Sequence, residues 1–408
     1  MCCLVDRVVA SSLALAASAG LCLAGPLAPP AGPVASTPGP EPRIAINATN
    51  TPGDNDATPS TFKITQPGSY YLASNLVGAA GKDGIEIAAS NVTIDLNGFT
   101  LSGINSNSGI VAQQALHGLV IRNGVVSLGF TDRGIRLRGQ TTDQSPLGST
   151  IEDITINSGV EAAIDVGASN RIASVVIDGA SSGIYAGSSN VIRDCVIRVG
   201  TTGMSVDEGS TIESVTVRAG DTGISVGGRG SVVRDCTVTE AAIGISVSNS
   251  VGTDGCLIQN CTLSSFSNLG IVASGIGGAR LDGNTVSGDP SKNPTAGIWG
   301  GDQVQVTNNV VRNIRSSGGL SVGVLIQGLN GRANVRGNTV VNCDKGIKAT
   351  MGGNAIYSNE LTQNTKQFEL AAGNRVGPIS TGTLSPQIDG NTGGNGMGST
   401  DPTANLLY

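Results

Sequence analysis

The sequence predicts an all-β protein, a single-stranded right-handed parallel β-helix (solenoid) of about 12 coils. Two observations predict this fold. First, a glycine followed by an aliphatic residue recurs at intervals of 20 to 29 residues, which is the mark of a solenoid repeat. Second, apolar and polar residues alternate in short runs between these pairs, as in half-buried strands. There are twelve such pairs, one of them with alanine in place of glycine: Gly84-Ile85, Gly109-Ile110, Gly134-Ile135, Ala163-Ile164, Gly183-Ile184, Gly203-Met204, Gly223-Ile224, Gly244-Ile245, Gly270-Ile271, Gly297-Ile298, Gly323-Val324 and Gly346-Ile347.

Each repeat is expected to form one coil. It opens with a run such as GIRL (134–137) and continues, about eight residues later, with a second run such as NVIRDCVIRV (190–199). The repeat is too short for a strand–helix unit and has room for two or three short strands. One repeat cannot bury its own apolar face, but stacking repeats with parallel pairing does so. The general handedness of parallel connections favours a right-handed helix.

The ends of the chain differ from the repeats. Residues 8–24 (VVASSLALAASAGLCLA) follow Arg7 and are apolar and rich in small residues, so residues 1–24 are predicted to be a secretory signal peptide. A membrane anchor is the alternative, although the stretch is short for a span. Residues 25–43 are predicted to be a Pro/Ala/Gly-rich linker, residues 44–375 the β-helix domain, and residues 376–408 a Gly/Ser-rich tail or cap ending in ANLLY.

These predictions place the protein outside the cytoplasm, secreted or at the periplasm or cell surface, with no membrane span in the mature chain. The formal net charge is −6 and the sequence has no basic cluster, so nucleic acid is not an expected partner.

One repeat position is predicted to form an inward ladder of small side chains. Cysteine occupies it in Cys195, Cys236 and Cys261, and asparagine takes it over further along the chain. Amides can hydrogen-bond from coil to coil, and thiols pack as small apolar groups. Cys236 and Cys261 fall on neighbouring coils, where a disulfide is geometrically allowed, but a pair of free stacked thiols is the favoured interpretation. The asparagines are Asn284, Asn309, Asn338 and Asn359.

The run ITQPGSYYLASNLVGAAGKDGIEIAASNVTIDLNGFTLSG (64–103), with TPGD (51–54) before it and DPTANLLY (401–408) at the end, resembles a family of bacterial exported right-handed parallel β-helix repeat proteins. That family is similar to the pectin-lyase-like superfamily, and the resemblance covers about residues 44–408. It implies the fold but no particular activity, because the superfamily includes lyases, hydrolases, epimerases and adhesins. The Asn-Thr-Asp, Gly-His-Gly and Arg-Ile-Lys motifs of polygalacturonases and the Trp-Ile-Asp-His run of common pectate lyases do not occur in this sequence.

The residue after each Gly-aliphatic pair is expected to face solvent, and this register brings three chemically distinct residues onto consecutive coils. They are Arg136, Asp165 and Tyr185, with Arg138 further along the strand of Arg136. In a uronate-processing enzyme, Arg136 and Arg138 would hold the substrate carboxylate while Asp165 or Tyr185 acted as the base. The alternative is a structural Arg136–Asp165 ion pair across the sheet. A groove over Arg136, framed by residues 139–148, would favour the catalytic interpretation.

A second candidate site lies before the first predicted coil. Asp54 and Asp56 in GDND (53–56) could bind Ca²⁺, although a polar turn explains them equally well. No cofactor is required by anything else in the sequence.

Two functions are therefore consistent with the sequence. The first is an exported β-solenoid that acts as a surface-associated binding or structural protein and contacts polysaccharide. The second is a polysaccharide lyase or epimerase that acts on uronic-acid-containing glycans at Arg136, Arg138, Asp165 and Tyr185. Carbohydrate binding is common to both.

Overall fold

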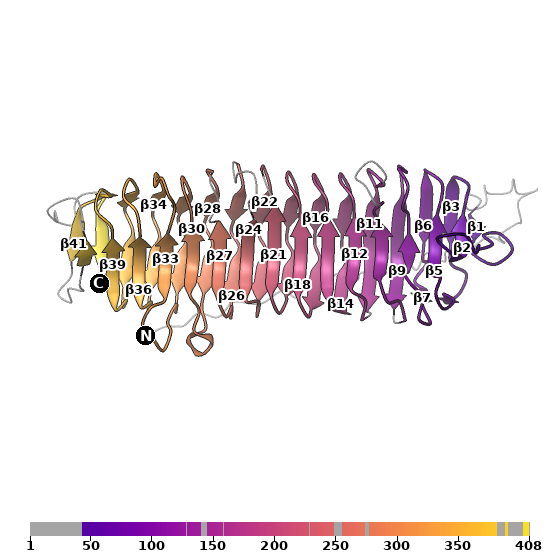
Figure 1. The fold of residues 1–408 in the computed structure, drawn as a ribbon, viewed down its shortest axis with the longest axis horizontal. Coiled ribbons are helices and arrows are strands. Elements are labelled where there is room, and N and C mark those ends of the chain that lie inside the picture. The colour runs from indigo at the N-terminus through magenta and orange to yellow at the C-terminus, as the bar shows by residue number, and fades with distance from the viewer. Residues whose placement is uncertain are drawn as a thin grey trace, which may run out of the picture. The chain divides into compact units, whose positions relative to one another are not determined.

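A computed structural model describes residues 43–407, except 128, 140–144, 158, 228, 249–254, 274–276, 382–387 and 391–402. The predicted signal peptide and residues 25–42 of the predicted linker lie outside the described residues. The described part of the chain forms a parallel β-helix, in which successive coils lie side by side and follow the order of the sequence (Figure 1). All strand pairs between neighbouring coils run parallel, which confirms the predicted fold class.

One strand of each coil belongs to a 15-stranded sheet. Its strands are β2 (Ser60–Ile64), β5 (Asp83–Ile87), β8 (Ile110–Val111), β10 (Arg133–Leu137), β12 (Ala162–Val166), β15 (Ser182–Ala186), β18 (Thr202–Val206), β21 (Thr222–Gly227), β24 (Ile243–Ser248), β27 (Leu269–Ala273), β30 (Ala296–Gly300), β33 (Val322–Ile326), β36 (Lys345–Ala349), β39 (Lys366–Leu370) and β42 (Ile388–Gly390).

The other strands form a 28-stranded sheet made of two parallel ladders, which β9 and β11 join because each of them spans both. The first ladder contains β1 (Ile44–Ala45), β3 (Gly68–Tyr71), β6 (Val92–Asp95), β9 (Val120–Ser127), β11 (Thr150–Asn157), β13 (Arg171–Ala173), β16 (Val191–Arg193), β19 (Thr211–Glu213), β22 (Val232–Arg234), β25 (Leu257–Gln259), β28 (Arg280–Asp282), β31 (Gln305–Thr307), β34 (Asn334–Arg336), β37 (Ala355–Tyr357) and β40 (Arg375–Val376). The second ladder shares β9 and β11 and adds β4 (Leu76–Val77), β7 (Thr100–Ser102), β14 (Val176–Ala180), β17 (Val196–Val199), β20 (Thr216–Arg218), β23 (Thr237–Thr239), β26 (Thr262–Ser264), β29 (Thr285–Ser287), β32 (Val310–Arg312), β35 (Thr339–Val341), β38 (Glu360–Thr362), β41 (Ile379–Thr381) and β43 (Asn405–Leu407).

The solenoid has about 14 turns, slightly more than the 12 that the glycine pattern predicts. The pattern misses β2, β39 and β42. In β2, Phe62 pairs with Ile85, so Thr61 takes the glycine position; in β39, Phe368 pairs with Ile347, so Gln367 does the same. The repeat therefore extends beyond the coils that carry the Gly-aliphatic marker.

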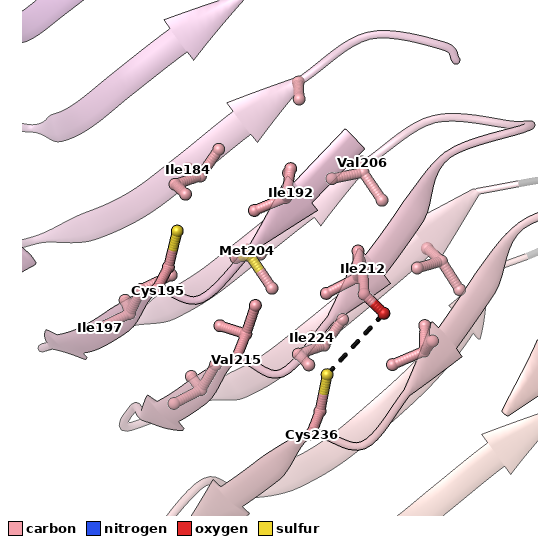
Figure 2. Close-up of a cluster of buried hydrophobic side chains, with 14 of the residues drawn as sticks. Ile184, Ile192, Cys195, Ile197, Met204, Val206, Ile212, Val215, Ile224 and Cys236 are labelled. Carbon is pink, nitrogen blue, oxygen red and sulfur yellow. Dashed lines mark hydrogen bonds between the residues drawn. The ribbon is translucent and has the colours of Figure 1, made fainter. Parts of the chain in front are cut away.

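The core is a stack of aliphatic side chains, one layer per coil. Ile184, Met204 and Ile224 lie on consecutive coils of the 15-stranded sheet and are fully or almost fully buried. Figure 2 shows them packed against Ile192 and Ile212 from the facing sheet. β-branched side chains stack well on pleated strands, so the core needs few aromatic residues.

The predicted ladder of small side chains is confirmed. The amide of Asn284 donates to the side-chain oxygen of Asn309 (2.9 Å), and Asn309 donates in the same way to Asn338 (3.0 Å). Asn338 then donates to Asn359 (2.9 Å). These amides are buried, so the bonds satisfy groups that water cannot reach.

The five described cysteines are free and buried, as the favoured interpretation predicts. Cys195 and Cys236 point into the core in Figure 2, where the Cys236 thiol contacts the carbonyl oxygen of Ile212 at 3.9 Å. Burial raises the pKa of Cys195 to about 11 and that of Cys256 to about 12, so these groups are uncharged thiols.

Helical structure in the described part of the chain is limited to one turn of 3-10 helix, Pro290–Lys292. Within the same part, no helix has the length and apolar character needed to cross a bilayer.

Candidate functional site on the outer face of the 15-stranded sheet

Two rows of side chains cover the outer face of the 15-stranded sheet. The first row, here called the outer row, is the predicted one: the residue after each Gly-aliphatic pair and its counterparts on the added coils. Its members pair in register from coil to coil: Lys63, Glu86, Val111, Arg136, Asp165, Tyr185, Ser205, Ser225, Ser246, Val272, Trp299, Leu325, Lys348 and Glu369.

The second row, here called the flanking row, is the residue before each corner glycine, and the alternation of apolar and polar residues does not predict it. Asp83, Arg133 and Leu269 belong to it. The glycine occupies a corner where a side chain would point inward: a Cβ on Gly223 would lie 2.2 Å from Val238. Because the glycine and the following residue both face the core, the residue before them faces outward with the outer row.

The register places Arg136, Asp165 and Tyr185 on three consecutive coils, as predicted. Their contacts differ from the predicted pairing. Arg136 forms an ion pair with Asp132 (3.4 Å), whereas Asp165 pairs with Arg138 (3.0 Å).

Further contacts complete this part of the face. The guanidinium of Arg133, from the flanking row, lies 3.7 Å from Asp165, and the hydroxyl of Tyr185 donates to Ser182 (3.2 Å). An Arg136–Asp165 ion pair was therefore the wrong expectation, because each arginine has another carboxylate within reach. Arg136 and Arg138 both have a carboxylate partner within the protein.

A cavity of about 480 Å³ opens on this face, centred one to two coils before Arg136. Its floor is formed by Glu86, Ile87 and Val111, and its walls by Thr58 and residues 113–115. Residues 113–115 follow β8 directly, so the short strand and the loop after it create the hollow. The predicted wall over Arg136, residues 139–148, lies partly outside the described residues, since 140–144 are not described.

Glu86 is the charged residue on the cavity floor, and its side chain is only partly satisfied. It is 8% exposed, and its Oε1 atom lies 3.1 Å from the ammonium of Lys63. Its Oε2 atom is buried and has no hydrogen-bond partner among the residues that the structure describes. A buried carboxylate oxygen without a donor is costly, which marks this atom as a place where a ligand could donate.

The two carboxylates predicted to bind Ca²⁺ already have a cation between them. The ammonium of Lys63 contacts Asp54 at 2.5 Å and Asp56 at 3.1 Å. Burial opposes the charge of Lys63, but hydrogen bonds to Asp54, Asp56 and Glu86 outweigh it and raise the pKa of Lys63. A backbone hydrogen bond from Thr58, together with Lys63, lowers the pKa of Asp56 to about 2.

In the described ranges, no group of three or more His, Cys, Asp or Glu residues is arranged to hold a metal ion. Asp54 and Asp56 therefore act in this structure as partners of a lysine, and Ca²⁺ binding there stays a prediction.

Asp83, at the start of the strand that carries Glu86, has a carboxyl pKa that is shifted toward neutral pH. It is buried, and its carboxylate accepts a hydrogen bond from the backbone of Ser108 (3.0 Å). Burial is the main cause that raises the pKa of Asp83 to about 6, and the nearby charges of Glu86 and Asp132 add to it. Perturbed carboxyl groups of this kind cluster at functional sites, although structural ion pairs produce them too.

The rest of the outer face changes character along the solenoid. Ser205, Ser225 and Ser246 form a row of hydroxyls on three consecutive coils. Beyond them lies an apolar cluster that is separate from the main core and combines both rows. Its members are Ile243, Leu269, Val272, Ala296, Trp299, Val322 and Leu325.

Comparison with known proteins supports the fold. The family described as "Right handed beta helix region" matches residues 203–365. The chain is accordingly a right-handed parallel β-helix protein. Comparison with curated proteins finds no significant match.

Solved structures with the same fold share little sequence identity with the chain. A mutant tailspike protein of E. coli bacteriophage HK620, in complex with a pentasaccharide, has a TM-score of 0.51 and 14% identity over 84% of this chain and 72% of that one. The A-module of mannuronan C-5 epimerase AlgE6 from Azotobacter vinelandii has a TM-score of 0.47 and 14% identity, over 83% and 89% of the two chains. A mutant of the periplasmic alginate epimerase AlgG has a TM-score of 0.49 and 12% identity, over 86% of both chains.

Proposed function

We propose that this solenoid is a surface-associated protein that binds polysaccharide along the outer face of its 15-stranded sheet. The observation that carries the proposal is the cavity over Glu86, which combines polar and apolar lining residues and contains a carboxylate oxygen without a hydrogen-bond partner among the described residues. Small-molecule sites combine these features: a concave, largely apolar surface with a few polar groups that fix orientation.

The regularity of the face suits a polymeric ligand. Equivalent positions repeat about every 4.8 Å along the solenoid, so a glycan chain can meet similar groups on successive coils. Hydroxyls at Ser205, Ser225 and Ser246 offer donors and acceptors, and Trp299 offers a ring on which a sugar could stack. The tailspike of phage HK620, which carries a pentasaccharide, is an example of this fold holding an oligosaccharide.

The proposal includes a location outside the cytoplasm. Its support is the apolar, small-residue stretch at residues 8–24 followed by the Pro/Ala/Gly-rich segment, the pattern of an exported protein. A protein at the cell surface or in the periplasm would be in contact with polysaccharide.

A glycan array with the full chain tests the binding proposal. Ala115→Trp would place an indole in the cavity wall, and we expect it to weaken binding about tenfold or more. Ala73→Trp is the matched control, since Ala73 is exposed and follows β3 on the other sheet. Equal binding by both variants would remove the cavity from the proposal, and retention of no glycan at all would refute the binding function.

A polysaccharide lyase or epimerase is the second candidate, and Asp83 is the observation that favours it. A carboxyl with a pKa of about 6 can take up and release a proton near neutral pH, and the charge of Arg136 is close enough to influence it. Incubation with uronic-acid polymers would reveal a lyase by the absorbance of the new conjugated double bond and an epimerase by a changed uronate composition. Binding of a glycan without formation of either product would favour polysaccharide binding, the first candidate function.

A further inference from the structure

Resting on the proposed binding function, we infer that the cavity over Glu86 accepts a sugar residue that donates hydrogen bonds, either neutral or amino-bearing, and rejects a uronate. The selectivity would come from Glu86, whose carboxylate can accept from a hydroxyl or an ammonium group but repels a second carboxylate. The arginines of the neighbouring coil would favour a uronate, so this inference assigns the cavity a different class of sugar.

The first step is that one carboxylate oxygen of Glu86 lacks a partner in the described part of the chain. The residue is 8% exposed, the ammonium of Lys63 contacts its Oε1 atom, and Oε2 has no partner among the described residues. This acceptor-only oxygen gains a hydrogen bond when a donor enters the cavity and the Glu86 side chain turns toward it. Hydrogen bonds to charged acceptors are stronger than neutral ones, so one such contact would contribute appreciably to binding.

The second step is the local balance of charge. Three carboxylates, those of Asp54, Asp56 and Glu86, contact the ammonium of Lys63. A second ammonium, that of Lys82, donates to the backbone carbonyl oxygen of Asp54 (2.8 Å). Three carboxylates and two ammonium groups leave a net charge of −1 beside the cavity. A uronate carboxylate placed there would be repelled, whereas a neutral or cationic residue would not.

The third step is the position of the nearby cations. The cavity lining contains no lysine or arginine among the described residues. Arg136 and Arg138 lie on the next coil, where Asp132 (3.4 Å) and Asp165 (3.0 Å) contact them. The ammonium of Lys82 is outside the lining and donates to the backbone carbonyl oxygen of Asp54 (2.8 Å). A uronate in the cavity therefore meets no cation of the described lining, and these nearby cations already have partners within the protein.

The remaining lining suits a sugar ring. The side-chain amides of Gln113 and Gln114 line the cavity and have no hydrogen-bond partner within the described part of the chain. Each amide offers both a donor and an acceptor, which matches the mixed character of sugar hydroxyls. Val111, which belongs to the outer row, supplies an apolar group beneath the C–H face of the ring, whereas the side chain of Ile87 packs into the core.

Calorimetric titration of the full chain with three hexasaccharides tests the inference: a neutral β-glucan, a chitosan oligomer and an oligogalacturonate. We expect the neutral or the amino-sugar oligomer to bind at least about tenfold more tightly than the uronate. Glu86→Gln should weaken the preferred ligand about tenfold and reduce the discrimination against uronate. Glu213→Gln is the matched control, because Glu213 is a carboxylate that pairs with a basic residue, Arg234, on the 28-stranded sheet and therefore lies outside the proposed binding face.

The outcomes separate the inference from the function on which it rests. Uronate binding that is tighter than the other two, or a preference that Glu86→Gln leaves unchanged, would overturn the inference and leave polysaccharide binding intact. If none of the three oligomers binds and a broad glycan array is also blank, the proposed function itself fails. A Gln113→Ala, Gln114→Ala double variant should weaken the neutral ligand while leaving thermal stability unchanged.

Discussion

Asp83 shows how strongly a single position in this repeat depends on the corner that follows it. Gly84 faces the core, so Asp83 faces outward but lies low on the sheet, where the residue is 5% exposed. Burial and the neighbouring carboxylates favour its protonated form. At most other coils the same position holds a neutral or basic residue, so Asp83 is an exception among its equivalents.

The raised pKa of Asp83 predicts a stability difference that depends on pH. A carboxyl whose pKa rises on folding, here from 3.8 to about 6, stabilises the fold while both states are protonated, and this contribution is lost as the pH rises from about 4 to about 6. Asp83→Asn keeps an acceptor for Ser108 but cannot ionise. We therefore expect the variant to match the natural protein near pH 4 and to exceed it at pH 8, by at most about 3 kcal/mol.

Chemical denaturation of both proteins at the two pH values checks this prediction. Comparing the variant with the natural protein at each pH cancels the other titrating groups. Glu369 is one of them: burial opposes its charge, but Lys348 and Lys345 lower its pKa to about 2, so its contribution falls as the pH drops from about 4.5 to about 2. A difference that is the same at both pH values would contradict the assignment.

At the scale of the strand, the corner glycine that marks each repeat is required because a side chain does not fit there, and not because of its backbone conformation. Gly223 does not have a positive φ, yet a Cβ there would lie 2.2 Å from Val238 Cγ1 and 2.5 Å from the carbonyl oxygen of Gly244 on the next coil. The strand thus passes so close to the core and to the following coil that hydrogen is the largest group that fits.

Gly223→Ala is accordingly expected to destabilise the protein by about 1–3 kcal/mol, the range for overpacking a well-packed core. Gly159→Ala is the control, because a Cβ at Gly159 meets nothing within 4 Å and its effect should stay within about 0.5 kcal/mol. Adding Val238→Ala to Gly223→Ala should recover part of the loss beyond additivity, since it removes one of the two atoms that a Cβ at residue 223 would approach too closely. Thermal or denaturant unfolding measures all three, and equal effects of the two glycine variants would disprove the spatial explanation.

The same geometry explains how much of the site could be predicted from the sequence. Parallel pairing maps each residue onto its equivalent one coil away, so the register of Arg136, Asp165 and Tyr185 follows from repeat spacing alone. The flanking row could not be found that way, because strict alternation places Asp83 inward. Its signal was present in the residues before each glycine, which are polar in the first coils and apolar around Trp299.

The repeat pattern could not predict which side chains contact one another. Arg136 has Asp132 four residues before it and Asp165 one coil away, and repeat spacing cannot decide which carboxylate it contacts. The repeat pattern could likewise not predict that one oxygen of Glu86 lacks a partner among the described residues, because this depends on how the ammonium of Lys63 is shared among three carboxylates. Long flexible side chains on a crowded face have several partners within reach, so their choice is a property of the folded surface.

At the scale of the whole solenoid, one buried ladder extends into the last described strand. The amide of Asn359 donates to Asn405 (3.1 Å), 46 positions later in the sequence, so β43 supplies the next rung after Asn284, Asn309, Asn338 and Asn359. β43 also pairs in parallel with β38 on one side and β41 on the other. Leu407 is fully buried, which makes this strand part of the core rather than a surface attachment.

Removing β43 is therefore expected to affect the whole molecule. Deletion of residues 403–408 would leave Asn359 without its acceptor and open the edge of β38, and an exposed parallel edge is a template for pairing with another chain. We expect the truncated protein to unfold at a lower temperature and to form oligomers that light scattering detects, whereas the natural protein should show neither change. Asn405→Ala keeps the strand and removes only the rung, so it should lower the unfolding temperature without inducing oligomers. A truncated protein that stays unassociated and as stable as the natural one would show that β43 contributes nothing to closing this end of the solenoid.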